Sequence, residues 1–541
     1  MPSIERQLIR AELTQRREEG CDVAEIEPRI ETAVADDDTE DEVFVRLYDE
    51  LDALEPDASF PYEEPSELSE IQALRPDGPR RIEANVPEDV LRNRIYGGWL
   101  GRAAGCSLGK PVEGWPRKRI DEYLSKTNAL PLEDYIPFTE GSISPFLKSS
   151  TKDNIEFMAR DDDMDYPIIG LIALERSGVD LTPRNMANTW LNYMPFNLLY
   201  TAENVAYRNF VNRRWPPESA TWRNPFREWI GAQIRADIFG YVTPGWPEKA
   251  AELAFQDASI SHVKNGIYGE MLMAAMLSAS FATNDVEEII QIGLSEIPAN
   301  CRLSEAVHDT VAWCNSTEDW EEVWDKIFDK YGHYHGVHTI NNAALVVMGL
   351  MFGRQDYEQG IVLTVRGGWD TDCNGATVGS ILGTKMGADS LPDKWIGVLS
   401  NRLMSVVRDF NDNRISDLAD RTYRMAEKIL STPDKSADAE TELGQDGGFA
   451  GVWKMQLGEN EYSLVIQEDH TGYMSSKSAG QKSKLREVKV DGNHIRFDFA
   501  LNRGSSEVDI EFRGRLNGDR LVGAGETNGF EFELTGLRQR S

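Results

Sequence analysis

The sequence predicts a mainly α-helical fold with a small antiparallel β-domain at its C-terminal end. Between residues 87 and 432, long apolar runs are rich in Ala, Leu, Ile and Met, as in Gly269–Phe281, Asn341–Phe352 and Thr377–Met386. Such runs favour buried helices. After residue 447 the apolar residues recur at every second position, which is typical of half-buried strands. With 541 residues the chain exceeds what one hydrophobic core usually serves, so we expect several domains.

Residues 1–86 are predicted to form an N-terminal extension with two charged helical stretches, Ile4–Glu18 and Asp41–Leu54. An acidic run at 36–42 separates them, and such runs are usually solvated. From Glu55 to Pro87 the chain is rich in proline and acidic residues. This composition indicates either a tether or an arm wrapped around the following domain.

The C-terminal part is predicted to be a linker at 433–447 followed by a β-domain at 448–541. Alternating apolar and polar residues predict strands at Tyr462–Ile466, Ile495–Phe499, Val508–Phe512 and Phe530–Leu534. Asp491-Gly492-Asn493 and Asn517-Gly518-Asp519 are predicted hairpin turns. We expect a small antiparallel barrel or sandwich that resembles the calycin-like modules appended to hydrolases, with no catalytic residues.

Composition and charge exclude several classes of protein. A formal net charge of −34 argues against a nucleic-acid-binding protein, because affinity for nucleic acid rests on basic contacts to phosphate. No apolar stretch approaches the roughly 18 residues of a membrane span, and the N-terminus has no apolar signal segment. Five scattered cysteines without metal-finger spacing predict a reduced, cytoplasmic protein. The oligomeric state cannot be predicted from these features.

Three short segments concentrate acidic residues at the ends of predicted helices. Gly97–Gly114 includes Glu113 near its end, Arg160–Asp165 contains four aspartates, and Gly367–Asn374 contains Asp370 and Asp372. Adjacent carboxylates repel one another, so such runs are solvated, cap a helix or bind cations. Taken singly, each run is more typical of helix capping than of a metal site.

In combination and order, these segments resemble the ADP-ribosylglycohydrolase family, whose pattern is roughly GDALGxPxE, TDDT and GGDTDT. The resemblance spans about residues 90–430. It implies an all-helical catalytic domain that holds two divalent ions, Mg²⁺ or Mn²⁺. It also implies a hydrolase that cleaves the bond between C1″ of ADP-ribose and an acceptor, so ADP-ribose or an ADP-ribosylated substrate is the expected ligand.

The resemblance carries over residue by residue. Glu113 falls on a metal-ligand glutamate, Asp162 and Asp163 best match the Asp-Asp pair, and Asp370 and Asp372 match the acids of the third motif. A register with the pair at Asp161–Asp162 stays open. The implied metal ligands are Glu113, Asp161, Asp162, Asp163, Asp370 and Asp372, and the implied catalytic residues are Glu113 and Asp163.

Three positions depart from the family pattern. Cys106 stands at the aspartate of the first motif, Asp161 at the first threonine of the second, and Cys373 at the last threonine of the third. Mg²⁺ prefers oxygen ligands, whereas a cysteine offers sulfur. Either Cys373 is not a ligand or the metal preference of the site is shifted, and Asp161 would partly compensate in charge.

A further resemblance follows Asp257, where the family has a His and glycine-rich turn that lines adenosine. It implies that His262, Asn265, Gly266 and Tyr268 contact the substrate, although a buried structural histidine is equally compatible with the pattern.

The segment Leu198–Pro247 is dense in Trp, Arg, Asn and Pro and is expected to have little regular structure, which is usual for functional segments. Its Asn224, Phe226, Trp229 and Gln233 could surround a base or leaving group. His333, His335 and His338 lack the further ligands that a zinc site needs.

Two alternatives to ADP-ribosyl hydrolysis stay open: a metal-dependent N-glycosidase that acts on another riboside, and a degenerate member that only binds. The retained set of acids argues against the degenerate member.

Two rows of glycine predict how the acids meet. Gly97, Gly101, Gly105 and Gly109 recur every four residues, as do Gly375, Gly379, Gly383 and Gly387. Residues four apart form a ridge on one helix face, and glycine there allows another backbone to approach. Glu113 follows the first row and Asp372 precedes the second, so only an antiparallel crossing brings them together. We therefore expect their carboxylates within about 10 Å of each other, the reach of a two-metal cluster.

Overall fold

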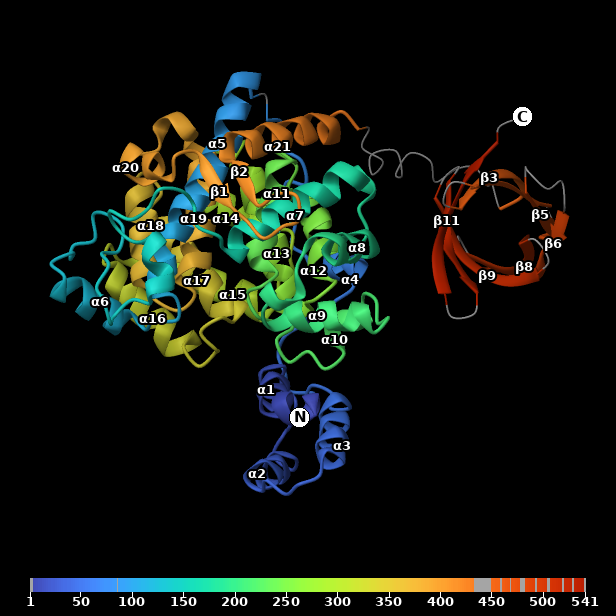
Figure 1. Ribbon diagram of the computed structural model, residues 1–541, viewed down its shortest axis with the longest axis horizontal. Helices are drawn as coiled ribbons and strands as arrows, with labels where there is room; N and C mark the ends of the chain where they lie inside the picture. The colour runs from blue at the N-terminus through green and yellow to red at the C-terminus, as the bar shows by residue number, and fades with distance from the viewer. Residues whose placement is uncertain are drawn as a thin grey trace. The chain divides into compact units, whose positions relative to one another are not determined.

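The protein is described by a computed structural model (Figure 1). It describes residues 3–84, 86–432, 449–457, 460–467, 469–476, 482–491, 494–503, 506–517, 520–527 and 530–539. Contacts divide the chain into two units, Met1–Thr432 and Pro433–Ser541. The predicted linker 433–447 lies outside the described residues, as do two positions in each predicted hairpin turn.

The N-terminal segment forms three helices, α1 (Ile4–Glu18), α2 (Glu27–Ala35) and α3 (Asp41–Asp52). The two predicted helices are therefore confirmed. They enclose a small core that includes Ile9, Leu13, Ile30, Phe44, Leu47, Tyr48 and Leu51. These helices contain many charged residues, and each has one apolar face that is buried in the core.

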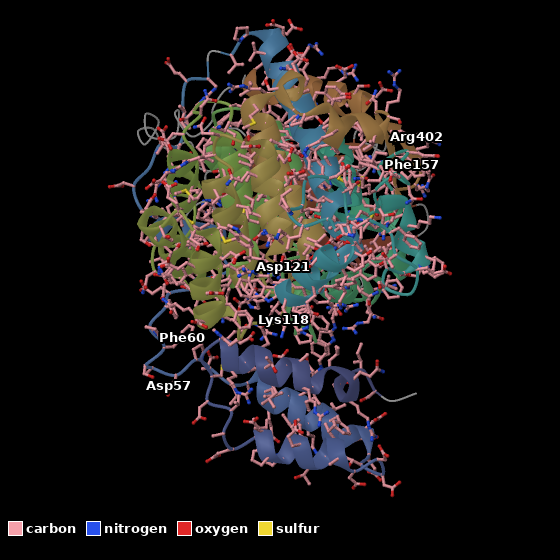
Figure 2. The ribbon with its side chains drawn as sticks, turned by 90° about the vertical axis from the view of Figure 1, so that its left-hand side faces the viewer. Asp57, Phe60, Lys118, Asp121, Phe157 and Arg402 are labelled. Carbon is pink, nitrogen blue, oxygen red and sulfur yellow. The ribbon has the colours of Figure 1, made fainter. Side chains whose placement is uncertain are left out.

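The proline-rich stretch that follows is an arm on the helical domain, so of the two expectations the wrapped arm is correct. Asp57 and Phe60 lie beside the N-terminal helices (Figure 2), where the Asp57 amide donates to the Gly20 carbonyl at 2.8 Å. Further on, the Ile82 amide donates to the Gly245 carbonyl at 2.7 Å. A short helix, α4 (Leu68–Leu74), lies between these contacts.

The remainder of the first unit is helical. Its helices are α5 (Glu88–Gly109), α6 (Arg117–Lys126), α7 (Asp162–Ser177), α8 (Pro183–Tyr193), α9 (Thr201–Val211), α10 (Glu218–Thr221), α11 (Asp237–Tyr241), α12 (Pro247–Ala258), α13 (Lys264–Ala279), α14 (Val286–Leu294), α15 (Arg302–Ser316), α16 (Trp320–Tyr331), α17 (Thr339–Phe352), α18 (Tyr357–Arg366), α19 (Thr371–Met386), α20 (Asp393–Ile396) and α21 (Ile415–Leu430). Short 3-10 turns are η1 (Lys110–Val112), η2 (Pro145–Ser150), η3 (Gly178–Asp180), η4 (Phe196–Leu198), η5 (Gln233–Arg235), η6 (Ala388–Ser390) and η7 (Gly397–Leu399), and one hairpin joins β1 (Arg402–Met404) to β2 (Asp412–Arg414). The apolar runs predicted as helices are α13, α17 and α19, which are buried along nearly their whole length.

Helices α5 and α19 pack antiparallel along the two glycine rows. A Cβ atom at Gly97 would lie 2.3 Å from the Gly383 carbonyl oxygen, one at Gly101 2.1 Å from that of Gly379, and one at Gly105 1.9 Å from that of Gly375. No side chain fits at such distances, so glycine is required for the close approach. The predicted crossing is confirmed, except that α19 ends at Met386 and Gly387 is its C-cap with φ of +80°.

The segment Leu198–Pro247 contains more regular structure than we expected, namely α9, α10, η5 and α11. Its asparagines explain why such short helices are stable, because their amides hydrogen-bond backbone carbonyls at helix ends. The Asn209 amide donates to the carbonyls of Ser219 and Trp222, and the Asn224 amide donates to those of Ala220 and Ser261.

The second unit is one curled antiparallel sheet, a half-barrel rather than two stacked sheets (Figure 1). Its strands are β3 (Gly451–Leu457), β4 (Asn460–Ile466), β5 (Gly472–Ser476), β6 (Lys482–Lys484), β7 (Arg486–Asp491), β8 (His494–Arg503), β9 (Ser506–Asn517), β10 (Arg520–Thr527) and β11 (Phe530–Arg538), in the order β6-β5-β4-β3-β11-β10-β9-β8-β7. The four predicted strands are confirmed. Trp453, Phe497 and Phe512 lie in its core.

Among the described residues, no helix has the length and apolarity that crossing a membrane requires.

Candidate metal centre

Helices α5 and α19 pack along their two glycine rows, and we call this contact the glycine seam. It brings the first and third acidic segments together. Glu113, which follows η1 directly after α5, places a carboxylate oxygen within 4.8 Å of carboxylate oxygens of Asp370 and Asp372. The predicted proximity of Glu113 and Asp372 is therefore confirmed. The Gly114 amide donates to the Trp369 carbonyl at 2.9 Å, which fixes the two segments to each other.

This group of three acids has no basic partner. Among the described residues, no lysine or arginine forms an ion pair with Glu113, Asp370 or Asp372. Asp370 and Asp372 are each 4% exposed, and the Oδ1 atom of each has no hydrogen-bond partner. Buried carboxylates without a counter-charge are costly, so these three acids could hold a metal ion.

The second acidic segment joins the centre at the start of α7. Asp163 is buried, and one of its carboxylate oxygens lies within 4.8 Å of an Asp372 oxygen and of the Cys373 sulfur. Arg102 of α5 holds Asp163, since its Nη2 donates to Asp163 Oδ1 at 3.1 Å and its Nε to the Asp163 carbonyl at 2.9 Å. Arg102 also pairs with Asp237 at 2.7 Å.

Asp161 is the N-cap of α7 and is neutralised by a lysine. Its Oδ1 accepts the Asp163 amide at 3.0 Å, and its Oδ2 pairs with Lys110 Nζ, which also donates to the Arg160 carbonyl at 2.6 Å. Upstream, Met158 exchanges backbone hydrogen bonds with Arg402 and Met404 of β1, which fixes the approach to α7. Figure 2 shows Arg402 beside Phe157, with the guanidinium 5.3 Å from the ring centroid.

Asp162 takes a different position from its neighbours. It is half-buried and belongs to none of the three clusters of potential ligand atoms found among the described residues. The structure therefore brings together Glu113, Asp161, Asp163, Asp370 and Asp372 through overlapping clusters, with Asp162 at their edge. Whether the family's Asp-Asp pair is Asp162–Asp163 or Asp161–Asp162 stays a prediction.

The pKa directions follow from this crowding. Desolvation and the charges of Asp370 and Asp161 raise the pKa of Glu113 to about 7. Burial and the neighbouring acids raise the pKa values of Asp372 and of Asp162 well above the ordinary value. Burial alone would also raise that of Asp161, but Lys110 lowers it. In this centre Lys110 pairs with Asp161 and Arg102 pairs with Asp163, whereas Glu113, Asp370 and Asp372 form no ion pair among the described residues.

Comparison with known families gives the same assignment as the motifs. The family model described as ADP-ribosylglycohydrolase matches residues 87–430. The chain belongs to the ADP-ribosylglycohydrolase family. It is also similar to a solved structure described as an "ADP-ribosylglycohydrolase-related protein complex", at 16% identity and a TM-score of 0.42, covering 62% of this chain and 99% of that chain. A search of curated proteins found no match.

The residues that the family resemblance assigns to the substrate are buried in the turn before α13 and in the first turns of that helix. Asn265 donates to Glu228 at 2.8 Å and accepts from the Leu303 amide at 3.0 Å. Tyr268 donates to the carbonyl of Pro65 in the arm. Both side chains are thus engaged within the protein, and their contact with substrate stays a prediction.

His262 and Gly266 belong to the same turn. Ser261 Oγ lies 2.8 Å from His262 Nδ1, whereas Nε2 is buried without a hydrogen-bond partner. Burial and the charge of Arg235 lower the pKa of His262 well below its ordinary value, so the ring is neutral. At Gly266 a Cβ would lie 2.6 Å from the Arg227 carbonyl oxygen, so the backbone itself requires glycine.

The aromatic and amide residues proposed as a wall have mainly structural contacts. The Asn224 amide donates hydrogen bonds to backbone carbonyls. Phe226 packs edge-on against Trp229, with ring centroids 4.7 Å apart. Trp229 stacks on His335 at 4.2 Å with ring planes 9° apart. Gln233 is the exception, because both atoms of its buried amide lack partners. The role of these residues at a substrate stays a prediction.

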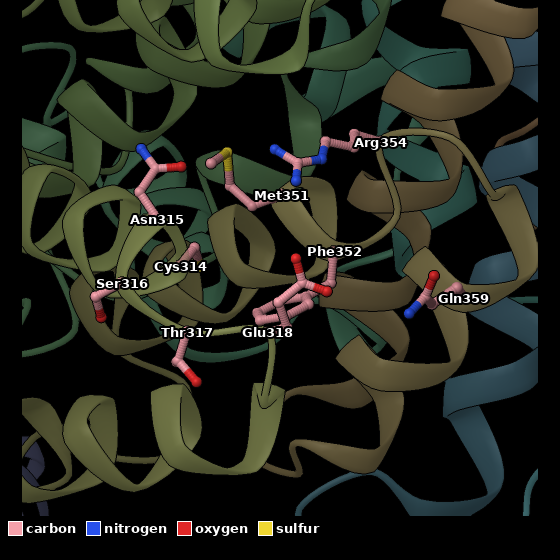
Figure 3. A pocket seen from close by; sticks show the side chains of 9 residues that line it. All are labelled: Cys314, Asn315, Ser316, Thr317, Glu318, Met351, Phe352, Arg354 and Gln359. Carbon is pink, nitrogen blue, oxygen red and sulfur yellow. The ribbon is translucent and has the colours of Figure 1, made fainter.

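One cavity of about 360 Å³ lies away from the acids, at the C-terminal ends of α15 and α17 (Figure 3). It is lined by Cys314, Asn315, Ser316, Thr317, Glu318, Met351, Phe352, Arg354 and Gln359. None of the predicted site residues lines it.

Two residues of the centre, Arg102 and Lys110, are not predicted by the sequence motifs. A signal for Arg102 was present, because an arginine inside the Gly-Ala-rich face of a buried helix needs an acidic partner. Lys110 gave no such signal, since a lysine at a helix end is usually solvent-exposed.

Proposed function

We propose that this family member is a hydrolase that cleaves the glycosidic bond at C1″ of ADP-ribosylated substrates with the help of two divalent cations, Mg²⁺ or Mn²⁺. The ligands would be drawn from Glu113, Asp161, Asp162, Asp163, Asp370 and Asp372. The observation that supports this best is the pair of buried, unpartnered Oδ1 atoms on Asp370 and Asp372 beside Glu113, without a basic residue.

The donor set fits such ions. Carboxylate oxygens are the ligands that Mg²⁺ and Mn²⁺ prefer. Divalent cations would neutralise acids that otherwise repel one another, and would offset the repulsion between a phosphate-bearing substrate and a chain with net charge −34. When bound, they supply the positive charge that orients ribose hydroxyls and lowers the pKa of water.

Glu113 is suited to proton transfer. It is the only one of the six acids whose residue is exposed, so it can reach solvent and a leaving group. In the metal-free chain, burial and the charges of Asp370 and Asp161 raise the pKa of this carboxyl group to about 7. Glu113 would accept the proton of the attacking water or donate one to the leaving group.

Asp163 is suited to positioning. Arg102 fixes one oxygen and the backbone of Asp163, leaving Oδ2 directed to the side where Asp372 and Cys373 lie. Its rotamer is therefore set before any substrate arrives, which reduces the entropy lost when the reacting groups are oriented.

We also propose a reducing compartment such as the cytoplasm as the place of action, which the five free cysteines support.

The experiment is release of ADP-ribose from a panel of acceptors ADP-ribosylated through nitrogen and oxygen, with Mg²⁺, Mn²⁺ or EDTA. We expect release that depends on the divalent ion. Equal rates in EDTA would contradict the metal-dependent centre. Cleavage of simple nucleosides without release of ADP-ribose would favour the N-glycosidase alternative, and no turnover at all would favour a binding protein.

A further inference from the structure

We propose that the thiol of Cys373 is a ligand of the ion held between Asp163 and Asp372, so that one metal position has a mixed oxygen and sulfur donor set. This rests on the proposed two-ion centre and specifies the chemistry of one of its positions. The carrying observation is that the Cys373 sulfur and carboxylate oxygens of Asp163 and Asp372 all lie within 4.8 Å of one another.

The fold directs the sulfur to this point. Cys373 follows Asp372 in the first turn of α19 and is 7% exposed. Its Sγ lies 3.1 Å from Asp163 Oδ2, the oxygen that Arg102 leaves free. An independent observation is that Asp372 has a buried Oδ1 atom without a hydrogen-bond partner, so this carboxylate can still bind a cation.

Ligand chemistry then predicts the ion. Mg²⁺ requires hard oxygen ligands in a near-octahedral set, whereas thiolate selects softer ions such as Zn²⁺ and Cd²⁺. On coordination the S–H bond would be replaced by a sulfur–metal bond, and the proton would pass to solvent. The all-oxygen group of Glu113, Asp370 and Asp372 stays suited to Mg²⁺ or Mn²⁺. The two positions would therefore differ in preference.

Cys106 provides a matched control. Its sulfur lies within 4.8 Å of Asp161 and Asp163, so it is a second buried thiol between two acids. There, however, Lys110 and the Asp163 amide occupy both Asp161 oxygens, and Arg102 occupies Asp163 Oδ1. Because these charges are already matched, we expect no ion beside Cys106.

The test is a titration of the EDTA-treated full chain with Cd²⁺, followed by the ultraviolet charge-transfer absorption of a cadmium–thiolate bond. We expect a band that saturates in the wild type, is retained in Cys106→Ser and is lost in Cys373→Ser. Competition with Mg²⁺ should show that Cys373→Ser weakens Cd²⁺ binding at least about tenfold more than Mg²⁺ binding. Circular dichroism and the melting temperature verify folding, and Cys373→Thr replaces the serine variant if that variant is unfolded.

The outcomes separate the two proposals. An unchanged band in a folded Cys373 variant, or no band in the wild type, would overturn the sulfur ligand. If Mn²⁺ still raises the melting temperature in that case, the two-ion centre stands without sulfur. If no divalent ion shifts the melting temperature or produces a band, both proposals fail.

Discussion

Two buried acidic clusters of the helical unit, each assembled from distant segments, differ in whether they contain their own counter-charges. Where the N-terminal helices meet the helical domain, Arg227 hydrogen-bonds Glu12 and Glu19 at 2.9–3.1 Å. Nearby, Arg302 pairs with Glu64 of the arm at 2.7 Å. All five side chains are nearly excluded from solvent. This cluster is electrostatically matched and fastens the N-terminal segment to the domain.

At the end of the glycine seam, Glu113, Asp370 and Asp372 converge without any such partner among the described residues. Both clusters carry buried acids, so burial or acidity alone does not distinguish a structural site from a functional one. The difference is charge matching. A matched cluster is already stable, whereas an unmatched one favours a ligand of opposite charge, which supports the proposed cation site.

Removing the counter-charge from the matched cluster should have the largest effect on stability. Arg227→Ala removes the guanidinium that binds Glu12 and Glu19 and leaves these buried acids only their weaker contacts, chiefly with Arg16, which should lower the free energy of unfolding by about 3 kcal/mol. Urea denaturation measures this. The exposed pair of Arg10 with Glu31 is the control, since Arg10→Ala should cost less than about 1 kcal/mol. Equal effects for the two variants would refute the distinction between matched burial and surface pairing.

Removing an acid from the unmatched cluster should act in the opposite direction on the metal-free protein. Asp372→Asn takes away a buried charge that repels its neighbours, so the melting temperature in EDTA should rise. Turnover should fall by more than about 100-fold, because even residues that only support metal ligands cost 10–100-fold. Glu19→Gln is the matched comparison and should lower the melting temperature. A lower melting temperature for Asp372→Asn in EDTA would show that its charge is compensated after all.

Filling the glycine seam should be costly to both fold and centre. At Gly379 a Cβ would lie 2.2 Å from the Gly101 carbonyl oxygen, a backbone atom that cannot rotate away. We expect Gly379→Leu to destabilise the protein by about 2–3 kcal/mol and to weaken Mn²⁺ binding, since the helices must separate. Gly114→Ala is a control without steric contact, although its φ of +70° adds some backbone strain. Normal Mn²⁺ affinity in a folded Gly379→Leu variant would show that the close packing of α5 and α19 is not needed for metal binding.

The glycine seam also shows which parts of this fold could be predicted from the sequence. Glycines spaced four residues apart lie on one helix face, and the absence of side chains on that face predicts that another helix packs closely against it. Because Glu113 follows one row and Asp372 precedes the other, their meeting could be predicted without coordinates. The strands of the C-terminal unit could be predicted for a similar reason, since alternation along the chain is a local property.

Charge matching could not be predicted, because it depends on which residues meet in three dimensions. Lys110 neutralises Asp161 across a sequence distance of 51 residues, and Arg227 meets Glu12 across 215. Nothing in the local sequence distinguishes these acids from the unmatched Asp372. Similarly, the Asn209 and Asn224 amides in Leu198–Pro247 reach carbonyls as far away as Trp222 and Ser261, which only the folded chain brings near.

Unmatched acids should also give the metal-free protein a characteristic pH dependence. The pKa of Glu113 is about 7 in the folded chain against an ordinary value of 4.5, so between these pH values the folded form binds more protons than the unfolded one. The stability of EDTA-treated protein should therefore fall as pH rises from about 4.5 to about 7. Glu113→Gln removes this contribution and should make the fall shallower.

The comparison between wild type and variant is essential here, because Glu18 and Glu296, which also have pKa values of about 7, add a fall of the same sign. Urea midpoints measured across this pH range in EDTA provide the readout. Identical slopes for Glu113→Gln and wild type would indicate that burial and the neighbouring acids do not raise the pKa of Glu113.

The smallest effect is expected from removing the β-domain. The sheet contains none of the acids of the centre, and contacts divide the chain after Thr432. A chain that ends at Thr432 should keep its helical circular dichroism spectrum, its response to Mn²⁺ and, within about twofold, kcat and KM on small ADP-ribosylated substrates. Loss of turnover in this folded truncation would place part of the chemistry in the sheet. If kcat and KM on small substrates are unchanged but KM on ADP-ribosylated proteins is raised, the sheet would contribute to acceptor binding. The proposed metal centre, with its unmatched acids, would then lie wholly in the helical unit.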